Sequence, residues 1–156
     1  MRDQRYHGHL KRFFPLLALA MLVWLRWRPF RVEVEGESML PTLRPGDWLI
    51  AVRATGAPMG ALVVVDPPGR PGYEMVKRIA GAPGDRTADR SLGPDEYWVL
   101  GDNEEGSTDS RTFGPVSAAS IRGRVVLRYW PLTAAALIEG GPRSGASGRS
   151  GRWRSP

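Results

Sequence analysis

Short apolar or alternating runs, separated by turns rich in glycine, proline and aspartate, dominate the centre of this chain. Polar and apolar positions alternate over 31–35, and mainly apolar runs follow at 48–54, 61–66, 74–80, 97–100 and 124–130. Runs of this length, bounded by turn residues, are typical of β-strands. The pattern therefore predicts a mostly β fold, a small twisted barrel or sandwich, with brief helical turns only near 38–44 and 116–121.

The two ends of the chain differ from this centre. Residues 1–12 are polar and basic, and the thirteen residues from Phe13 to Leu25 carry no charge. A bilayer core needs about twenty apolar residues, but flanking arginines can lengthen a short run by snorkelling. We expect an uncleaved signal anchor, a hydrophobic helix over 13–28; a cleaved signal peptide and an interfacial helix are the alternatives. The Gly/Ser/Arg-rich tail at 140–156 is expected to be disordered, which leaves 31–139 as the folded domain.

The amino-acid composition excludes several kinds of catalytic and metal-binding site. The sequence has no cysteine, and both histidines, His7 and His9, precede the predicted domain. Disulfides, thiolate nucleophiles and cysteine-bound metals are therefore excluded, as is a Ser-His-Asp triad within the domain. We expect no metal and no cofactor. The net charge of +6 and the basic tail are compatible with binding to acidic lipid or nucleic acid. A tail that is simply solvated is the simpler interpretation.

Lysine is rare in this chain. Of 22 basic residues only Lys11 and Lys77 are lysines, and all the others are arginines. Period-two alternation puts Lys77 on the same strand face as Met75 and Ile79, while Arg78 faces the opposite way. Burial among apolar neighbours disfavours the ammonium and lowers its pKa toward the range of a general base. The pattern alone leaves two interpretations open: a catalytic lysine, or a lysine whose amine reaches water.

Ser38 lies in the stretch VEGESMLPTLRPGD, Val34 to Asp47, which has the glycines and prolines of a turn but also two apolar residues after the serine. As the N-cap of a short turn, Ser38 would have only a local structural role. As a nucleophile it needs a base, and in a domain without histidine or cysteine a lysine is the natural one. The presence of Lys77 in the same domain favours the nucleophile.

The segment from Tyr97 to Val116 starts as a strand and continues as a loop dense in aspartate, asparagine, serine and threonine. Short polar side chains at this density bond to neighbouring backbone groups. The loop is either a self-bonded structure or, in addition, a scaffold whose hydroxyl orients the lysine amine. Its acidic residues do not have the spacing of an EF-hand calcium loop.

Three blocks in this order, GESMLPTLRPGD (36–47), VKRIAGAPGD (76–85) and GDNEEGSTDSRTFGPV (101–116), resemble the type I signal peptidases, membrane endopeptidases with a Ser-Lys dyad. The resemblance covers about residues 32–131 and implies a mostly antiparallel β catalytic core. It implies that Ser38 is the nucleophile and also an oxyanion donor through its backbone N–H, that Lys77 is the general base, and that Ser107 orients the lysine. It places Met39 near the substrate cleft. It also implies structural support from Gly36, from Gly101 beside the lysine, and from two ion pairs, Arg78 with Asp102 and Asp109 with Arg111.

The resemblance implies that the enzyme removes leader peptides from precursor proteins after small residues, through an acyl-enzyme. The implied partners are a precursor protein and the lipid bilayer, at the plasma membrane with the catalytic domain outside the cytoplasm, and no specific nucleic acid. Glycine at position 36 stands where one branch of the family has a serine. The backbone N–H of Ser38 would then carry more of the oxyanion stabilisation.

Three other functions stay open. Only eleven residues, Arg86–Glu96, separate the lysine block from the next strand, so the chain has a minimal catalytic core. Through STDSRTFGPV (107–116) and RYWP (128–131), it also resembles the small maturation proteases of nickel superoxide dismutase, which trim one dedicated precursor. Self-cleaving regulators like the SOS-response repressors share the Ser-Lys dyad, but no helix-turn-helix pattern precedes the domain here. The last alternative is a membrane-tethered binding module without turnover.

Overall fold

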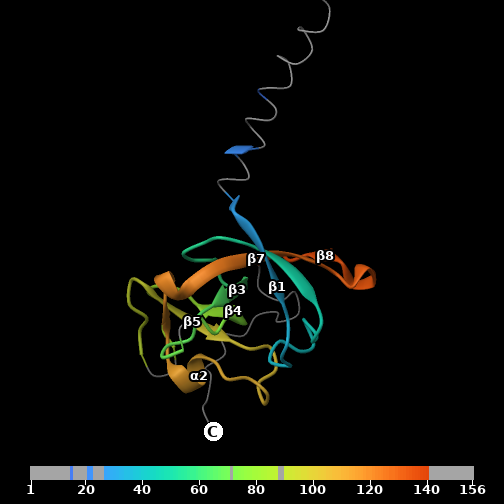
Figure 1. The fold of residues 1–156 in the computed structure, drawn as a ribbon. Helices are drawn as coiled ribbons and strands as arrows, with labels where there is room; N and C mark the ends of the chain where they lie inside the picture. The colour runs from blue at the N-terminus through green and yellow to red at the C-terminus, as the bar shows by residue number, and fades with distance from the viewer. Residues whose placement is uncertain (1–14, 16–20, 23–26, 71, 88–89, 141–156) are drawn as a thin grey trace, which may run out of the picture.

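The structure is a computed structural model that describes residues 15, 21–22, 27–70, 72–87 and 90–140. Within these residues, antiparallel strands form one eight-stranded sheet in the order β1-β2-β7-β3-β4-β5-β6, with β8 paired to β7 (Figure 1). The strands are β1 (Pro29–Glu33), β2 (Trp48–Val52), β3 (Leu62–Val65), β4 (Met75–Gly81), β5 (Glu96–Leu100), β6 (Val116–Ser117), β7 (Ile121–Trp130) and β8 (Ala136–Leu137). The prediction of a mostly β, antiparallel fold is thus confirmed, as a single curled sheet that stays open between β1 and β6.

The helical elements of the described chain are short. They are α2 (Ser110–Phe113) and the 3-10 turns η1 (Ala118–Ser120) and η2 (Leu132–Ala134). The turn predicted near 116–121 corresponds to η1. The segment 38–44 forms hydrogen-bonded turns instead of a helix, with one helical bond from the N–H of Leu43 to the carbonyl of Met39 at 2.9 Å. The helix α2, inside the predicted polar loop, was not expected.

Three predicted segments lie wholly or largely outside the described residues: the basic segment 1–12, the anchor 13–28 and the tail 140–156. In the part of the chain that the structure does describe, no helix combines the length and the apolar character needed to cross a bilayer.

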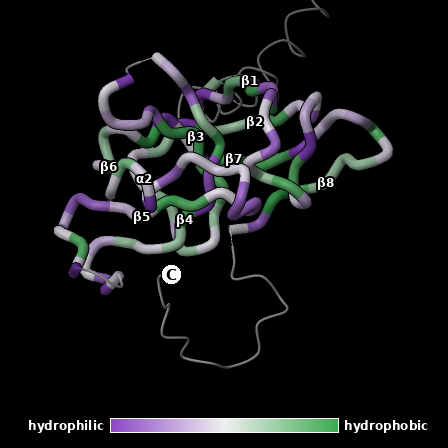
Figure 2. The backbone as a smooth tube through the Cα atoms, turned by 90° about the horizontal axis from the view of Figure 1, so that it is seen from below, coloured by the Kyte–Doolittle hydropathy of each residue, from purple (hydrophilic) through white to green (hydrophobic). Residues whose placement is uncertain are grey.

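Both faces of the sheet are buried at its centre. All four residues of β3 are buried, and their side chains alternate between two core clusters, with Leu62 and Val64 in one and Val63 and Val65 in the other. The hydrophobic stretches accordingly coincide with the central strands, and polar residues fill many of the connecting loops (Figure 2). A β-branched run suits a strand that packs on both sides.

The first core cluster fixes the loop between β1 and β2, which carries Ser38. Met39 and Leu43 of this loop are each 1% exposed and pack against β2, β3 and β7. The ends of the loop are joined by two backbone hydrogen bonds, from Val34 N–H to the Asp47 carbonyl at 2.9 Å and from Gly46 N–H to the Val34 carbonyl at 2.8 Å. The loop is therefore held from below by apolar burial and closed at its base by the backbone.

Candidate active site

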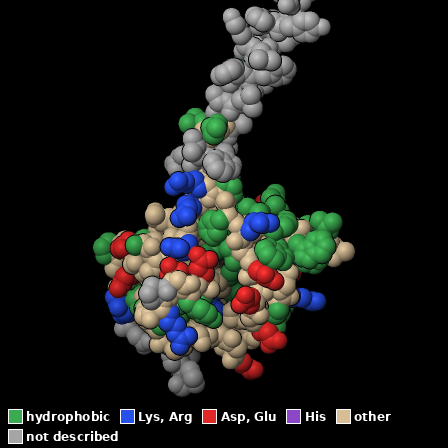
Figure 3. All heavy atoms as spheres, viewed as in Figure 1, with side chains coloured by type: hydrophobic (Ala, Val, Ile, Leu, Met, Phe, Trp, Pro, Cys, Tyr) green, Lys and Arg blue, Asp and Glu red, His purple; other side chains and the backbone are tan. Residues whose placement is uncertain are grey.

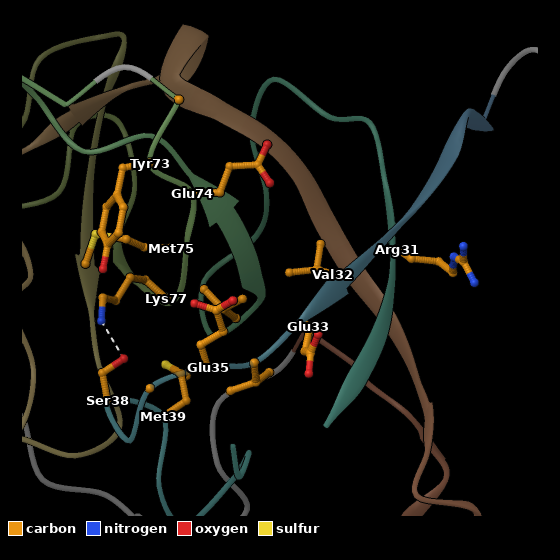
Figure 4. A pocket seen from close by; sticks show the side chains of 14 residues that line it. Arg31, Val32, Glu33, Glu35, Ser38, Met39, Tyr73, Glu74, Met75 and Lys77 are labelled. Atoms are coloured by element: carbon orange, nitrogen blue, oxygen red, sulfur yellow. Dashed lines mark hydrogen bonds between the residues drawn. The ribbon is translucent and has the colours of Figure 1, made fainter. Parts of the chain in front are cut away.

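The side chains of Ser38 and Lys77, thirty-nine residues apart, meet in the structure (Figure 4). The Lys77 Nζ donates to the Ser38 Oγ at 2.7 Å and to the Ser107 Oγ at 3.2 Å. Lys77 comes from β4, Ser38 from the β1–β2 loop and Ser107 from the loop before α2. The three residues singled out from the sequence as nucleophile, base and orienting hydroxyl therefore form one hydrogen-bonded group.

The Lys77 side chain is almost completely buried, with 1% of its surface exposed. Burial lowers the pKa of Lys77 below its ordinary value. The negative charges of Asp109 and Asp102 oppose this lowering of the pKa, while the positive charge of Arg111 adds to it. A neutral amine has a lone pair, so the contact seen at 2.7 Å also suits transfer of the hydroxyl proton to the amine.

Asp109 organises the loop that carries Ser107. Its side chain is fully buried and caps α2, accepting from the backbone N–H of Arg111 at 3.1 Å and from that of Gly101 at 2.9 Å. Arg111 adds a two-point ion pair, with Nε at 3.0 Å and Nη2 at 2.8 Å from the carboxylate. Burial alone would raise the pKa of Asp109, but hydrogen bonds from Arg111, Gly101 and Ser107 hold this pKa below its ordinary range. An ionised carboxylate here keeps the Ser107 hydroxyl aimed.

Gly101 leaves space that the site occupies. A Cβ built on Gly101 would lie 2.1 Å from the Ser107 Oγ and 2.6 Å from the backbone oxygen of Ser38. Any larger residue would therefore collide with both hydroxyl-bearing segments. The sequence resemblance implied that Gly101 leaves room beside Lys77. In the structure, the room left by the missing side chain is occupied by Ser38 and Ser107, the two serines that contact Lys77.

Arg78, the neighbour of Lys77 on β4, points to the opposite face. Its guanidinium forms a two-point ion pair with Asp102, with Nε at 2.8 Å and Nη2 at 2.7 Å from the two carboxylate oxygens. The remaining Nη1 donates to the Gly60 carbonyl at 2.7 Å. Planar two-point pairs of this kind fix geometry as well as charge. This pair fastens the start of the polar loop to the strand that carries the lysine.

Two supports of the β1–β2 loop, which carries Ser38, were not singled out from the sequence. The backbone N–H of Asn103 donates to the Ser38 carbonyl at 3.0 Å, and its side-chain amide donates to the Glu37 carbonyl at 3.2 Å. At the other end of the loop, Arg128 of β7 reaches the buried carboxylate of Asp47 at 3.1 Å. The carboxylate of Asp47 also accepts from the backbone N–H of Arg44 at 3.0 Å, but its pairing with Arg128 has no local signal in the sequence, because the two residues are eighty-one positions apart.

A cleft of ≈ 400 Å³ runs beside Ser38 and Lys77. Its walls are residues 31–36, at the end of β1 and beyond, and residues 72–77, at the start of β4. Met39 lines this cleft but belongs equally to the core, since only 1% of it is exposed. Gly36 also lines the cleft, and a Cβ built there would have nothing within 4 Å.

Two unpaired strand edges flank this cleft. β5 pairs with β4 only from Arg78 onward, so Met75–Lys77 have no strand partner on that side. β1 pairs only with β2, which leaves its other edge open among the described strands. Edges of this kind are templates for an added strand. Among the described residues, no group of three acidic or histidine side chains is arranged to hold a metal ion.

Residues 7–90 and 86–130 match the profile of the family described as signal peptidase, peptidase S26. The chain belongs to this family. Its signal peptidase-like sequence is 36% identical over 115 residues to mitochondrial inner membrane protease subunit 1 of Xenopus tropicalis, covering 65% of this chain and 69% of that protein. It is 40% identical over 116 residues to mitochondrial ATP-independent inner membrane protease subunit 1a of Arabidopsis thaliana, covering 64% and 69%. The human mitochondrial inner membrane protease subunit 1 is 31% identical over 127 residues, covering 71% and 75%. This member of the signal peptidase family is accordingly a peptidase.

Proposed function

We propose that this peptidase is a Ser-Lys endopeptidase that removes leader peptides from precursor proteins. The observation that carries the proposal is the contact of a buried lysine amine with a serine hydroxyl at 2.7 Å, at the end of an open cleft. Burial favours the neutral amine, which is the form that a general base needs. The family membership supports peptide-bond hydrolysis as the reaction.

The reaction would proceed through an acyl-enzyme. Lys77 takes the proton of Ser38 while the serine oxygen attacks the scissile carbonyl carbon, and the backbone N–H of Ser38 stabilises the resulting oxyanion. Lys77 then gives its proton to the leaving amine, so that the peptide bond breaks and the ester remains on Ser38. A water molecule, deprotonated by Lys77, attacks this ester and releases the second product. Ser107 holds the amine in position through both stages.

The cleft suits a substrate in extended conformation. The open edges of β1 and β4 offer backbone groups on both of its walls, so a leader segment can lie between them as an added strand. Such a segment would pass Ser38 at the end of the cleft. The preference for small residues before the scissile bond follows from the family resemblance.

We also propose that the protein works at a membrane. The mitochondrial relatives are named as inner membrane proteases, and the sequence provides the apolar run from Phe13 to Leu25. Apolar side chains also gather on the surface over the β7–β8 end (Figure 3), where Leu132 and Leu137 are 74% and 76% exposed. In this proposal residues 13–28 cross the plasma membrane once and leave the catalytic domain outside the cytoplasm. Membrane fractionation, with protease protection of the C-terminal tail, tests both statements.

Two substitutions test the dyad on a fluorogenic leader peptide. Ser38→Ala removes the nucleophile, and Lys77→Arg keeps a positive charge but removes the base. Both should abolish cleavage while circular dichroism stays unchanged. Ser91→Ala and Lys11→Arg are the matched controls and should keep full activity. Full activity in either dyad variant would refute the proposed function.

The range of substrates separates a general leader peptidase from a dedicated maturation enzyme. The connection after β4 is short and is closed by a bridge between Arg86 and Ser91. This small size is consistent with a dedicated maturation enzyme. Purified protein would be incubated with a generic signal-peptide substrate and with a nickel superoxide dismutase precursor. Cleavage of the precursor alone would select the dedicated enzyme. Intact mass after prolonged incubation of the protein alone tests self-cleavage.

A further inference from the structure

The cleft beside Ser38 is acidic although the chain is basic. The whole sequence has a net charge of +6, yet Glu33, Glu35 and Glu74 line the cleft (Figure 4). Arg31 lines the cleft as well, but its side chain points away from Ser38 in this view. Lys77, the other cation among the described residues that line the cleft, is buried at its end. The charged side chains that line the space a substrate would enter are therefore mainly carboxylates.

Two of these carboxylates have no cationic partner among the residues that the structure describes. Glu33 and Glu35 form no ion pair with any lysine or arginine that the structure describes, whereas Glu74 lies 3.4 Å from Arg122. The buried carboxylates of the domain behave differently, because Asp47, Asp102 and Asp109 each pair with an arginine. The ion pairs thus neutralise the buried carboxylates that support the fold, whereas Glu33 and Glu35 of the cleft stay unpaired among the described residues.

The spacing of Glu33 and Glu35 matches that of an extended peptide. Both residues are exposed, and Val34 between them is buried in the core, so their side chains leave the same face of the chain. Alternate side chains of an extended peptide repeat at about 6.6 Å. Glu35 precedes Ser38 by three residues, so the Cα atoms of the two residues are at most about 11 Å apart. A peptide lying along this wall would therefore bring every second side chain past a carboxylate.

Resting on the proposed function, we propose that this cleft selects leader segments with lysine or arginine at alternate positions, about three and five residues from the scissile bond. Glu35 and Glu33 are the residues that determine this specificity. Each forms an exposed ion pair with the substrate, and exposed pairs of this kind change an equilibrium by about 1.5- to 5-fold. Two of them should favour a basic leader over a neutral one by about two- to 25-fold in kcat/KM.

The test uses matched fluorogenic peptides with alanines before the scissile bond. One peptide has lysine at the third and fifth residues before that bond, a second has lysine at the corresponding residues after it, and a third has glutamine throughout. The wild-type enzyme should prefer the peptide with lysine before the bond by the stated factor, and 1 M salt should reduce the ratio toward one. A preference for the peptide with lysine after the bond would overturn the inference. The double variant Glu33→Gln/Glu35→Gln should lose the preference, while Glu105→Gln, an exposed carboxylate outside the cleft, should keep it.

Binding to the Ser38→Ala variant, measured by fluorescence anisotropy, separates this inference from the proposed function. A tighter Kd for a lysine peptide, lost with Glu33→Gln/Glu35→Gln, would support charge selection even if the wild type cleaved no peptide. Cleavage of all three peptides at equal rates would overturn the inference and leave the proposed function standing. A lysine preference that persists in the double variant would overturn the assignment to Glu33 and Glu35.

Discussion

Substitution of Gly101 by alanine should strongly reduce activity without removing any group that contacts the substrate. The new Cβ would lie 2.1 Å from the Ser107 Oγ, 2.5 Å from the Ser107 Cβ and 2.6 Å from the Ser38 carbonyl oxygen. An ordinary contact begins at 3.4 Å, so the Ser107 hydroxyl has to move by about 1.3 Å. The Ser38 carbonyl has less freedom, because the Asn103 N–H holds it at 3.0 Å.

The size of the effect follows from this displacement. A shift of 1.3 Å takes the Ser107 hydroxyl out of its 3.2 Å contact with the Lys77 amine, and pressure on the Ser38 backbone disturbs the 2.7 Å contact as well. A misplacement of about 1 Å in a catalytic group costs roughly 100-fold in rate. Stability should fall by only about 1–3 kcal/mol, as is usual for an overpacked interior.

The assay is kcat on the leader peptide, measured beside urea unfolding of the same preparation. Gly93→Ala is the neutral control, because a Cβ there meets nothing closer than 3.4 Å. Gly56→Ala is the control for strain, since its Cβ would lie too close to the Tyr97 hydroxyl, away from the dyad. We expect Gly56→Ala to lose stability and keep kcat. Full kcat in Gly101→Ala would refute the conclusion that close packing at this glycine positions the two serines.

Three further predictions concern charge and the oxyanion. Consider the pH range between the lowered pKa of Lys77 in the folded chain and the ordinary pKa of a lysine. In this range Lys77 binds fewer protons in the folded than in the unfolded chain, so its titration makes the free energy of unfolding rise with pH. Lys77→Met should therefore stabilise the fold most below that window and progressively less as the pH rises through it; urea unfolding across the pH range measures this, and a gain independent of pH would contradict it. Gly36→Ser should raise kcat/KM by about three- to tenfold, because the added hydroxyl meets open space in the cleft and offers a second oxyanion donor; an unchanged or lower value would argue against this donor position. Asp47→Asn should cost about 2 kcal/mol of unfolding free energy, because Arg128 keeps its charge and loses its buried partner; a loss below the error of urea unfolding would show that this pair does not hold the loop.

The strands could be predicted because their apolar runs are bounded by turn residues, and the departures have local causes. β7 begins at Ile121, three residues before the predicted run at 124–130, since Arg122 and Gly123 interrupt the apolar pattern. Gly123 nevertheless lies within the strand, and glycine is needed there because a Cβ would lie 2.5 Å from the Val52 carbonyl oxygen. β6 and β8 have two residues each, too few to show a period. The four-residue α2 was hidden in a polar stretch for the same reason.

The sequence could predict those members of the candidate site that are recognisable by their residue type. It could not predict contacts made by backbone groups or by side chains far apart in the sequence. Elimination of histidine and cysteine left Lys77 as the partner for Ser38, and the family resemblance added Ser107. Asn103 supports Ser38 mainly through its backbone N–H, a group that nearly every residue has. The pairing of Asp47 with Arg128 needs the fold, because no local pattern in a single sequence joins residues so far apart.

The buried hydrogen bond from Gly101 to Asp109 gives the site a reporter that needs no substrate. The Gly101 amide is buried and donates to a carboxylate whose pKa is held below its ordinary range, so the bond should persist well into acid. Exchange of this proton with heavy water requires the polar loop to open. Its exchange rate therefore measures how often the Ser107 scaffold comes apart, and an inactive variant with slow exchange at Gly101 has an intact scaffold and a purely chemical defect.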